Sequence, residues 1–440
     1  MDLEHRRPVS SFILFDAWLL SVGYEGQVVY AMGRLNGLQV SGLVQVAMLA
    51  HAVGLVAGGL LTGSPATARK VMIAMALTCL AASTALWAGP AAWWTAVLPL
   101  ASLAAGVFNA AWIFLLQSGV APAGRFKAIA AGLAGATLLM VVINMAASYV
   151  HPRLGLGLAM AALGGSAWTL AGVKPAMMPR PNTAPVARPL ALLCVFIVTV
   201  TITAGLMFAV FNAAFAGYPL LTSLYWALPY VAALAVIARQ PAGRDRSHVL
   251  YAALALIGFG YLAFAVMDRS MLSYVIIDTL LLGAFGVIDL FWWSVLETLA
   301  AHAPRPGSIW GCGLAVNVAG VWAGEQLSRL AGCFDASLGT TLCALGSICV
   351  SIVVLPLSYH RLTARLAGGP FMARNDVPAL DRRLTGREQQ VAALLMQGYT
   401  YRGIARQLYI SPSTVKTHIQ SIYQKLEVAN KSELLVKLRH

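Results

Sequence analysis

The chain is poor in charged residues. Of its 440 residues, 30 are Lys or Arg and 16 are Asp or Glu, so charged side chains make up 10% of the sequence. A soluble globular domain carries about 25%, whereas hydrophobic residues here reach 59%. This composition excludes a wholly soluble protein and indicates a chain that lies largely in a membrane. It also excludes collagen-like, disulfide-scaffold and disordered chains.

Signatures of catalytic chemistry are also missing. The six cysteines form no CxxC pair and five of them lie in apolar runs, so packing in a membrane core explains them better than a metal site. The sequence has no GxSxG elbow, no P-loop, no HExxH motif and no set of kinase motifs. We therefore expect no enzyme activity, no cofactor and no metal site.

Apolar runs long enough to cross a membrane recur through residues 1–359. A spanning helix needs about 20 mostly apolar residues. Twelve runs have this character, at roughly 11–32, 38–61, 70–88, 92–118, 126–150, 154–173, 190–217, 219–238, 249–267, 271–296, 308–331 and 337–358. The longest polar break, residues 174–189, holds five prolines and three basic residues and is typical of a linker. We predict an all-α bundle of twelve membrane helices in two halves, residues 1–173 and 190–359.

The distribution of Lys and Arg between the loops predicts the orientation of this bundle. With the N-terminus inside, cytoplasmic segments hold thirteen Lys or Arg and outer loops hold four. Cytoplasmic loops are the ones enriched in positive charge. The bias therefore predicts that both termini lie in the cytoplasm, and an even number of spans agrees with it.

Positions 180 residues apart show a weak internal repeat. Residues 106–117 and 286–297 share Gly-Val, a polar residue, Trp, Leu and a final Gln or Glu in the same register. A six-plus-six topology with a basic central loop and a parallel repeat resembles the major facilitator superfamily. The motif that this family carries between spans 2 and 3 is incomplete here, because Gly63 stands where an Asp is expected. That departure argues against an ordinary transport cycle.

Several polar side chains lie at bilayer depth in the predicted spans. Charges there are costly and usually face a bundle interior. Asp278 and Asp289 are eleven residues apart, which places both on one face of the tenth span. Hydrogen bonding between helices explains such residues equally well, and no Lys or Arg lies deep in a span beside the acids. We predict a cavity for a cationic or polar ligand, lined by Asp16, Glu25, Asn109, Gln117, Asp278, Asp289 and Glu325.

The composition changes after Pro356. Residues 360–380 are polar and include a Gly-Gly-Pro sequence, which predicts a cytoplasmic linker. Residues 381–440 hold ten Lys or Arg against four Asp or Glu. Their pattern predicts a soluble module of four helices, whose starts are marked by a capping box and three caps: Thr385 with Glu388, then Thr400, Ser411 before Pro412, and Ser432.

The third helix of this module, from about residue 412 to 426, has two unlike faces. Val415, Ile419, Ile422 and Leu426 recur at helical spacing and predict a buried stripe. The opposite stripe holds Thr414, Lys416, Thr417, Gln420 and Lys425. Two short helices of which the second is polar and basic describe a helix-turn-helix, and Lys and Gln are side chains that read guanine and adenine in the major groove. A basic adaptor that binds protein is the alternative.

The module also carries a specific resemblance. LTGREQQV at 384–391, TVKTH at 414–418 and IYQKLEV at 422–428 resemble the LuxR-type (GerE-like) helix-turn-helix of bacterial transcriptional regulators. The resemblance implies binding to double-stranded DNA and pairing of two copies through the last helix. It implies base-edge contacts for Lys416, Thr417 and Gln420, positions near the phosphate backbone for Ser411, Ser413, Thr414 and Lys425, and a packing or phosphate role for His418.

The module departs from the family pattern at two places. Gly403 replaces the usual Glu, which removes a second capping box after Thr400, and Asn430-Lys431 replaces a small residue followed by Arg. Both changes weaken the module without altering the stripe that faces DNA.

Three functions fit these observations. The first is a regulator anchored in a bacterial cytoplasmic membrane, in which the twelve-helix body senses a signal and the C-terminal module binds DNA. The second is a transporter with a regulatory DNA-binding tail. The third is a membrane scaffold whose helix-turn-helix binds protein. The sequence identifies neither the signal nor the target genes.

Overall fold

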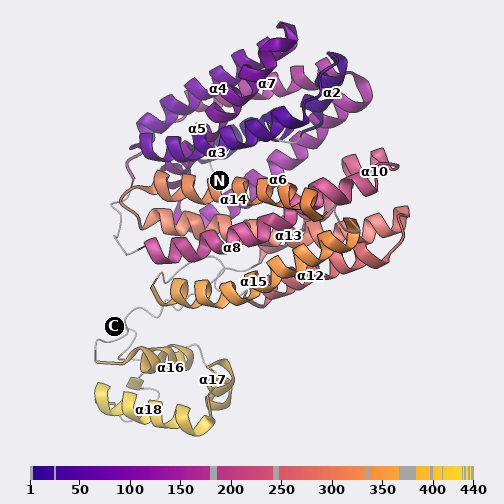
Figure 1. Ribbon diagram of the computed structural model, residues 1–440. Coiled ribbons are helices and arrows are strands. Elements are labelled where there is room, and N and C mark those ends of the chain that lie inside the picture. Colours follow the sequence, from indigo (N-terminus) through magenta and orange to yellow (C-terminus); the bar gives the residue numbers. More distant parts are fainter. Residues whose placement is uncertain are drawn as a thin grey trace.

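A computed structural model describes residues 3–23, 26–178, 186–240, 247–331, 336–365, 383–396, 400–408, 410–428, 430, 433–434 and 437 (Figure 1). All regular secondary structure in these residues is helical, as the sequence predicts. The first half of the body holds α1 (Leu3–Trp18), α2 (Gln27–Leu35), α3 (Ser41–Leu61), α4 (Pro65–Ala88), α5 (Trp94–Gly119), α6 (Pro122–Met145) and α7 (Pro152–Ala171).

The second half of the body follows the same plan. It holds α8 (Ala187–Leu206), α9 (Asn212–Ala214), α10 (Pro219–Leu224), α11 (Ala227–Arg239), α12 (Ser247–Val266), α13 (Met271–Ala301), α14 (Pro306–Ala331) and α15 (Ala336–Arg365). Short π-helical turns extend α1, α6 and α8. The C-terminal module holds α16 (Gly386–Met396), α17 (Tyr401–Gln407) and α18 (Pro412–Leu426).

Prolines mark the starts of many of these helices. Pro65, Pro122, Pro152 and Pro219 each occupy the first turn, where a missing backbone N–H removes no helical hydrogen bond. Ser64 completes the start of α4, because its hydroxyl accepts from the Thr67 N–H at 3.2 Å. The short polar breaks between apolar runs therefore end one helix and begin the next.

Ten helices in the described residues are long and apolar enough to cross a membrane. The count rises to eleven if α1 and α2, which meet at a bend of 44°, form one broken span. Helix α14 is 26 residues long but is not among these eleven. The predicted number of twelve thus stays a prediction.

The two halves pack against each other along two helix pairs. Helix α3 of the first half lies along α14 of the second (Figure 1). Helix α6 of the first half also packs against α11 of the second. A side chain at Gly59 of α3 would bring its Cβ within 2.3 Å of the Gly307 carbonyl oxygen of α14. Only glycine permits this approach, so α3 and α14 meet backbone to backbone at one end of the bundle. We call this the tether end, because α15 leaves the bundle there toward the C-terminal module.

The C-terminal module has a hydrophobic core of its own. Leu395 of α16, Ile404 of α17 and Ile422 of α18 are buried together, with Leu434 beside them. The described residues include three of the four predicted helices. At the fourth, the Glu433 N–H donates to the Asn430 side chain at 3.0 Å, and the Asn430 amide donates to the Glu433 carboxylate at 2.9 Å. Asn430 therefore caps this turn, two residues before Ser432, which lies outside the described residues.

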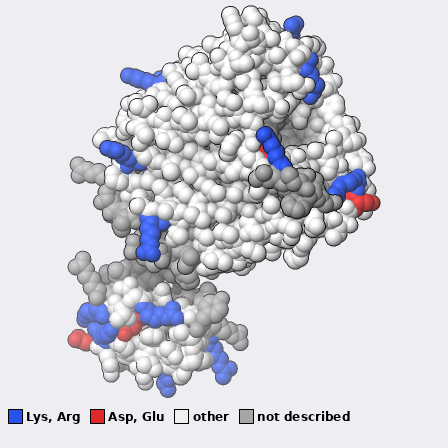
Figure 2. Space-filling model, viewed as in Figure 1, with Lys and Arg blue, Asp and Glu red and all other residues white. Residues whose placement is uncertain are grey.

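The region between the body and the module differs from the prediction at its start. The linker was expected from residue 360, but α15 continues to Arg365. The rest of the predicted linker lies outside the described residues. On the face shown in Figure 2, charged side chains are scattered sparsely over the large membrane body and lie closer together on the small module. The surface thus repeats the contrast in composition.

Candidate DNA-binding face and membrane polar layer

Helix α18 is held in place by a complete N-terminal cap and an apolar face. The Ser411 hydroxyl accepts from the Thr414 N–H at 3.0 Å, and Pro412 occupies the first turn. Val415, Ile419, Ile422 and Leu426 are buried in the module core, as the sequence predicts. Because they recur at helical spacing, the opposite face of α18 is left to solvent.

That exposed face carries most of the residues predicted to contact DNA. Ser411, Ser413, Thr414, Lys416, Thr417 and Gln420 are exposed, and His418 is half-buried. The hydroxyls at the start of the helix contact one another, with Ser411 Oγ at 2.6 Å from Ser413 Oγ and 2.8 Å from Thr414 Oγ1. The exposed face of α18 therefore presents a cluster of hydroxyls at the start of the helix, followed by the ammonium group of Lys416 and the amide of Gln420.

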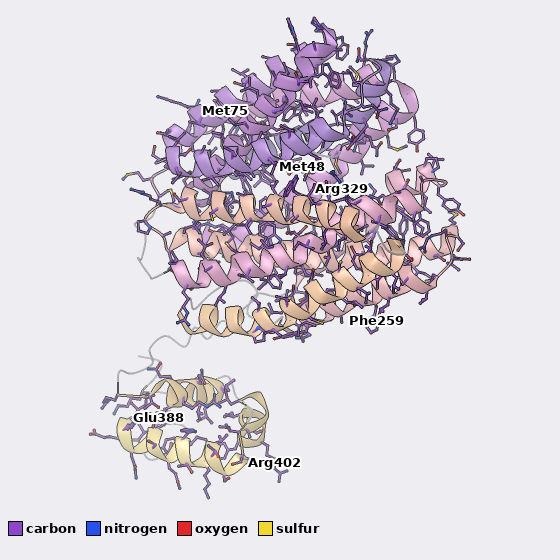
Figure 3. All side chains as sticks on the ribbon, in the orientation of Figure 1. Met48, Met75, Phe259, Arg329, Glu388 and Arg402 are labelled. Atoms are coloured by element: carbon purple, nitrogen blue, oxygen red, sulfur yellow. The ribbon has the colours of Figure 1, made fainter. Side chains whose placement is uncertain are left out.

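Lys425 is placed differently from the rest of the predicted stripe. Its ammonium donates to both carboxylate oxygens of Glu388, at 2.8 and 3.0 Å, and Ser421 donates to the same carboxylate at 2.6 Å. Glu388 also accepts from the Thr385 N–H at 2.7 Å, which confirms the predicted capping box of α16. Burial acts to raise the pKa of Glu388, but these donors outweigh it and lower the pKa to about 2. Glu388 thus lies between α16 and α18, whereas Arg402 points away from the module (Figure 3).

In the membrane body, four aromatic rings fill the space between the two halves. Phe12 of α1 stacks on Trp112 of α5 with ring centroids 4.2 Å apart. In the other half, the ring centroids of Trp293 of α13 and Trp310 of α14 are 5.1 Å apart. The centroid of Trp293 is 5.9 Å from that of Phe12, and the centroid of Trp310 is 6.0 Å from that of Trp112. We call these four residues the aromatic layer. All four are buried, so the layer closes the interior of the bundle at this depth.

A polar layer lies one helical turn beyond the aromatic layer, away from the tether end. The Asn109 amide donates to Asp16 Oδ1 at 3.1 Å within the first half. In the second half, Tyr230 of α11 and Trp292 of α13 each donate to Asp289, both at 3.0 Å. Tyr230 lies within electrostatic range of Asp16 as well as Asp289. We use the name polar layer for Asp16, Asn109 and Asp289, which were all predicted to line a cavity. The donors Tyr230 and Trp292 were not predicted.

A third set of contacts lies on the tether side of the aromatic layer. Arg125 in the first turn of α6 donates to Glu297 Oε1 at 2.9 Å, and both side chains are buried. Gln117 donates to the same oxygen at 3.2 Å, and Arg125 also donates to the Gln117 carbonyl at 2.8 Å. We expected no basic partner for the acids within the membrane, and Glu297 is an exception because Arg125 folds back into the bundle instead of facing a loop.

The other predicted cavity residues do not join the polar layer. Glu325 of α14 accepts from Gln45 of α3, so it joins the two halves toward the end of α14 that is opposite the tether end. Asp278 is fully buried beside Tyr274, toward the end of α13 that is opposite the tether end. Gln117 belongs to the contacts of Arg125, and Glu25 lies outside the described residues. Among the described residues, no group of three or more His, Cys, Asp or Glu could hold a metal ion.

Comparison with known proteins identifies the C-terminal module. Residues 382–438 match the family described as bacterial regulatory proteins, luxR family. These residues are a LuxR-family helix-turn-helix domain. The match supports the interpretation of α17 and α18 as the two helices of a DNA-binding motif.

The LuxR-family domain is similar to domains of longer regulators. It is 44% identical over 63 residues to the HTH-type transcriptional regulator MalT of Vibrio campbellii, covering 14% of this chain and 7% of that protein. It is 44% identical over 61 residues to the monoamine regulon transcriptional regulator of Klebsiella aerogenes, covering 14% of this chain and 26% of that protein. The likeness concerns the DNA-binding domain alone, because the chain spans so little of each relative.

The membrane body is similar to a protein of another class. The crystal structure of the human organic anion transporter MFSD10 (TETRAN) aligns with a TM-score of 0.61 and 15% identity, covering 81% of this chain and 100% of that chain. At this identity the likeness shows the fold alone. The chain thus joins a body with a major-facilitator-like fold to a LuxR-family domain.

The ion pair between Glu388 and Lys425 predicts how the stability of the LuxR-family domain depends on pH. The pKa of Glu388 is about 2 in the folded domain and about 4.3 in an unfolded chain. The stabilisation is therefore complete above about pH 4.3 and is lost as the pH falls toward 2. We expect Glu388→Gln to lower the free energy of unfolding of isolated residues 381–440 by about 1–2 kcal/mol at pH 7, measured by urea unfolding.

The same measurement between pH 5 and 2 supplies the control. The wild-type domain should lose stability over this range and Glu388→Gln should lose less. Glu427→Gln, which removes an exposed carboxylate just after α18, should follow the wild-type profile. Identical pH profiles for Glu388→Gln and the wild type would show that the pair contributes nothing.

Proposed function

We propose that this chain is a membrane-anchored transcriptional regulator. The LuxR-family domain binds double-stranded DNA while the body holds it at a bacterial cytoplasmic membrane. One observation carries this proposal: a module with its own core and an exposed polar face on α18 is joined, on one chain, to ten or more helices of membrane-spanning length. DNA is reached only from the cytoplasm, which agrees with the bias of Lys and Arg toward the predicted inner loops.

The number of spans in this proposal is twelve. The broken pair α1 and α2 supplies the eleventh, and α14 supplies the twelfth. Helix α14 is less apolar than the other spans, because it carries Asn317, Glu325 and Gln326. It nevertheless contacts α3, α8 and α13, so it lies inside the bundle. An even number brings the C-terminus back to the side of the N-terminus.

The roles within the DNA-binding domain follow from exposure. Lys416, Thr417 and Gln420 read base edges, and the hydroxyls of Ser411, Ser413 and Thr414 lie toward the phosphates, with His418 at the margin of this face. Lys425 instead stabilises the packing of α18 against α16, because its ammonium is paired with the Glu388 carboxylate. Two copies pair through the last helix of the domain, so the operator has two half-sites.

The body acts as the sensor in this proposal, and no part of the chain is an enzyme. Its two halves meet along α3 and α14 and along α6 and α11, so a ligand held between them changes how they pack. A ligand shifts such an equilibrium only by binding one arrangement more tightly than the other. The change reaches the DNA-binding domain through α15.

Inverted membrane vesicles that contain the full-length chain test the proposal. Their cytoplasmic face points outward, so they should retain a duplex selected from a random pool, whereas right-side-out vesicles should not. Lys416→Ala and Gln420→Ala should each lower the discrimination between the selected duplex and a scrambled one by about 1–3 kcal/mol. The readout is the apparent Kd for each duplex at one fixed salt concentration.

A matched control is available on the same helix. Gln424 is exposed near the end of α18, and Gln424→Ala should discriminate between the duplexes as the wild type does. Retention of DNA by right-side-out vesicles would contradict the orientation. Wild-type discrimination in both Lys416→Ala and Gln420→Ala would contradict base reading by α18.

A transporter with a DNA-binding tail is the second candidate. The polar layer between the two halves and the likeness to a human organic anion transporter favour it. Solute uptake into proteoliposomes that Asp289→Asn abolishes would support this candidate.

A further inference from the structure

We propose that the polar layer binds a small organic ammonium ion that arrives from the side opposite the tether end. The proposal rests on the sensor role proposed above and specifies the class of ligand. Asp16, Asn109 and Asp289 supply the binding atoms, and Tyr230 and Trp292 hold Asp289 in place through their hydrogen bonds.

The helical register brings the three binding residues to one depth. Asp16 lies four residues after Phe12, Asn109 three before Trp112, and Asp289 four before Trp293. Side chains three or four residues apart lie on one face of a helix, one turn apart. Because the three aromatic rings touch across the two halves and α1 runs opposite to α5 and α13, each polar residue lies one turn beyond the aromatic layer on the same side.

The atoms in this layer call for a ligand that carries hydrogen-bond donors and positive charge. Asn109 is 6% exposed and donates its amide to Asp16, but its carbonyl oxygen Oδ1 is buried with no hydrogen bond to any described residue. Such an orphaned acceptor is costly unless a ligand or water pairs with it. An ammonium group offers three donors and no acceptor. In the proposed complex the ammonium group therefore donates to the Asn109 oxygen and to the carboxylates of Asp16 and Asp289.

The described residues of the chain supply no cation for these two carboxylates. The helices that carry the polar layer, α1, α5 and α13, hold no Lys or Arg except Arg6 and Arg7, which lie in the first turns of α1. Arg125, the buried cation nearest the interior, donates to Glu297 and to the carbonyls of Gln117 and Val120. Acidic side chains inside a membrane protein are costly unless they are paired or neutralised. A metal site usually needs three or more His, Cys, Asp or Glu side chains, and the described residues bring no such group together here. An organic cation therefore fits this layer better than a metal ion.

Burial shows from which side the ligand arrives. Asp289 and Tyr230 are half-buried and Asp16 and Asn109 are buried, whereas the four rings of the aromatic layer, on the tether side of them, are all buried. The contacts of Arg125 and Glu297 and the close approach of Gly59 to Gly307 lie farther toward the tether end. The aromatic layer is thus the floor of the proposed site.

Calorimetric titration of the full-length chain in nanodiscs, which expose both membrane faces, tests the proposal. The probes are ethylammonium, butylammonium and phenethylammonium, each compared with the carboxylate of matching length: propionate, pentanoate and 3-phenylpropanoate. We expect at least one ammonium ion to bind and its matching carboxylate not to bind. Asp16→Asn and Asp289→Asn, which keep the side-chain size, should each weaken that binding about 30-fold or more.

The control is Asp278→Asn, which removes a buried acid from the same face of α13 about 16 Å away along the helix. Its affinity should stay within about threefold of the wild type. The proposal is overturned if no ammonium ion binds, if the carboxylates bind as well, or if Asp16→Asn and Asp289→Asn bind like the wild type. Thermal unfolding of each unliganded variant shows that it is folded.

DNA retention by the same preparations separates this proposal from the proposed function. If the selected duplex is retained but no ammonium ion binds, the proposed ligand is wrong and the proposed regulator function stands. If the wild type does not retain the duplex, the proposed regulator function is wrong, whether or not an ammonium ion binds. A change in the Kd for DNA when the ammonium ion is added would show that ligand binding in the polar layer controls DNA binding.

Discussion

Arg125→Leu is expected to lower the free energy of unfolding of the full-length chain by about 3–5 kcal/mol. The substitution leaves the Glu297 carboxylate buried without its cation, and it also removes the donors to the Gln117 and Val120 carbonyls. Breaking a buried pair from one side costs more than the pair itself contributes, because the remaining charge stays desolvated. Unfolding in mixed detergent micelles with rising denaturing detergent measures the change.

The double variant Arg125→Leu with Glu297→Leu isolates the cause. It removes both charges, so it should recover most of the stability that Arg125→Leu loses. Arg34→Leu is the matched control, because Arg34 is exposed at the end of α2 and its loss should change stability by less than about 0.5 kcal/mol. A double variant that is less stable than Arg125→Leu would rule out an isolated charge as the cause.

Arg125 also shows where the sequence could not predict the site. The count of loop charges treated Arg125 as a residue of a cytoplasmic loop, but such a count says nothing about partners. Its partner Glu297 is 172 residues away. The repeat at 180 residues makes Gln117 and Glu297 equivalent positions, yet equivalence does not imply contact. They touch at 3.2 Å because both lie where the two halves meet.

The fold was predictable to the extent that hydropathy determines it. The run at 38–61 corresponds to α3 at Ser41–Leu61, and the run at 154–173 to α7 at Pro152–Ala171. The first run, 11–32, was expected to be one helix but is broken before α2. A Cβ at Gly26 would lie 2.1 Å from the Ser21 carbonyl oxygen, so the break needs a glycine. Mean hydropathy does not register such a local contact.

In the DNA-binding domain the sequence predicted the faces of α18 but not every role on them. Helical spacing separates Val415 and Ile419 from Lys416 and Gln420, and the structure agrees. Lys425 shared the polar stripe but pairs with Glu388, which is 37 residues earlier. Glu388 had been assigned only to a capping box. A carboxylate accepts several hydrogen bonds, so it caps α16 and holds α18 together.

Gly59→Ala is expected to lower the free energy of unfolding by about 3 kcal/mol, at the upper end for added volume in a packed interior. The new Cβ would lie 2.3 Å from the Gly307 carbonyl oxygen and 3.2 Å from the Ser308 Cα. Both are backbone atoms of α14, so no side-chain rotation relieves the contact and α3 and α14 must move apart. The Ser308 hydroxyl, which donates to the Gly59 carbonyl at 3.2 Å, would be displaced with them.

The same substitution at Gly42 separates this contact from the helix preference of alanine. Gly42 lies on the same helix with nothing within 4 Å of its Cβ, so Gly42→Ala should be neutral or stabilise by up to about 1 kcal/mol. Detergent unfolding of the three proteins measures both effects. A Gly59→Ala chain as stable as Gly42→Ala would mean that α3 and α14 are not held together at the tether end. Separating the two helices there also moves α14, whose Trp310 belongs to the floor of the polar layer. One methyl group at the tether end would then weaken ammonium binding at a layer that it does not touch.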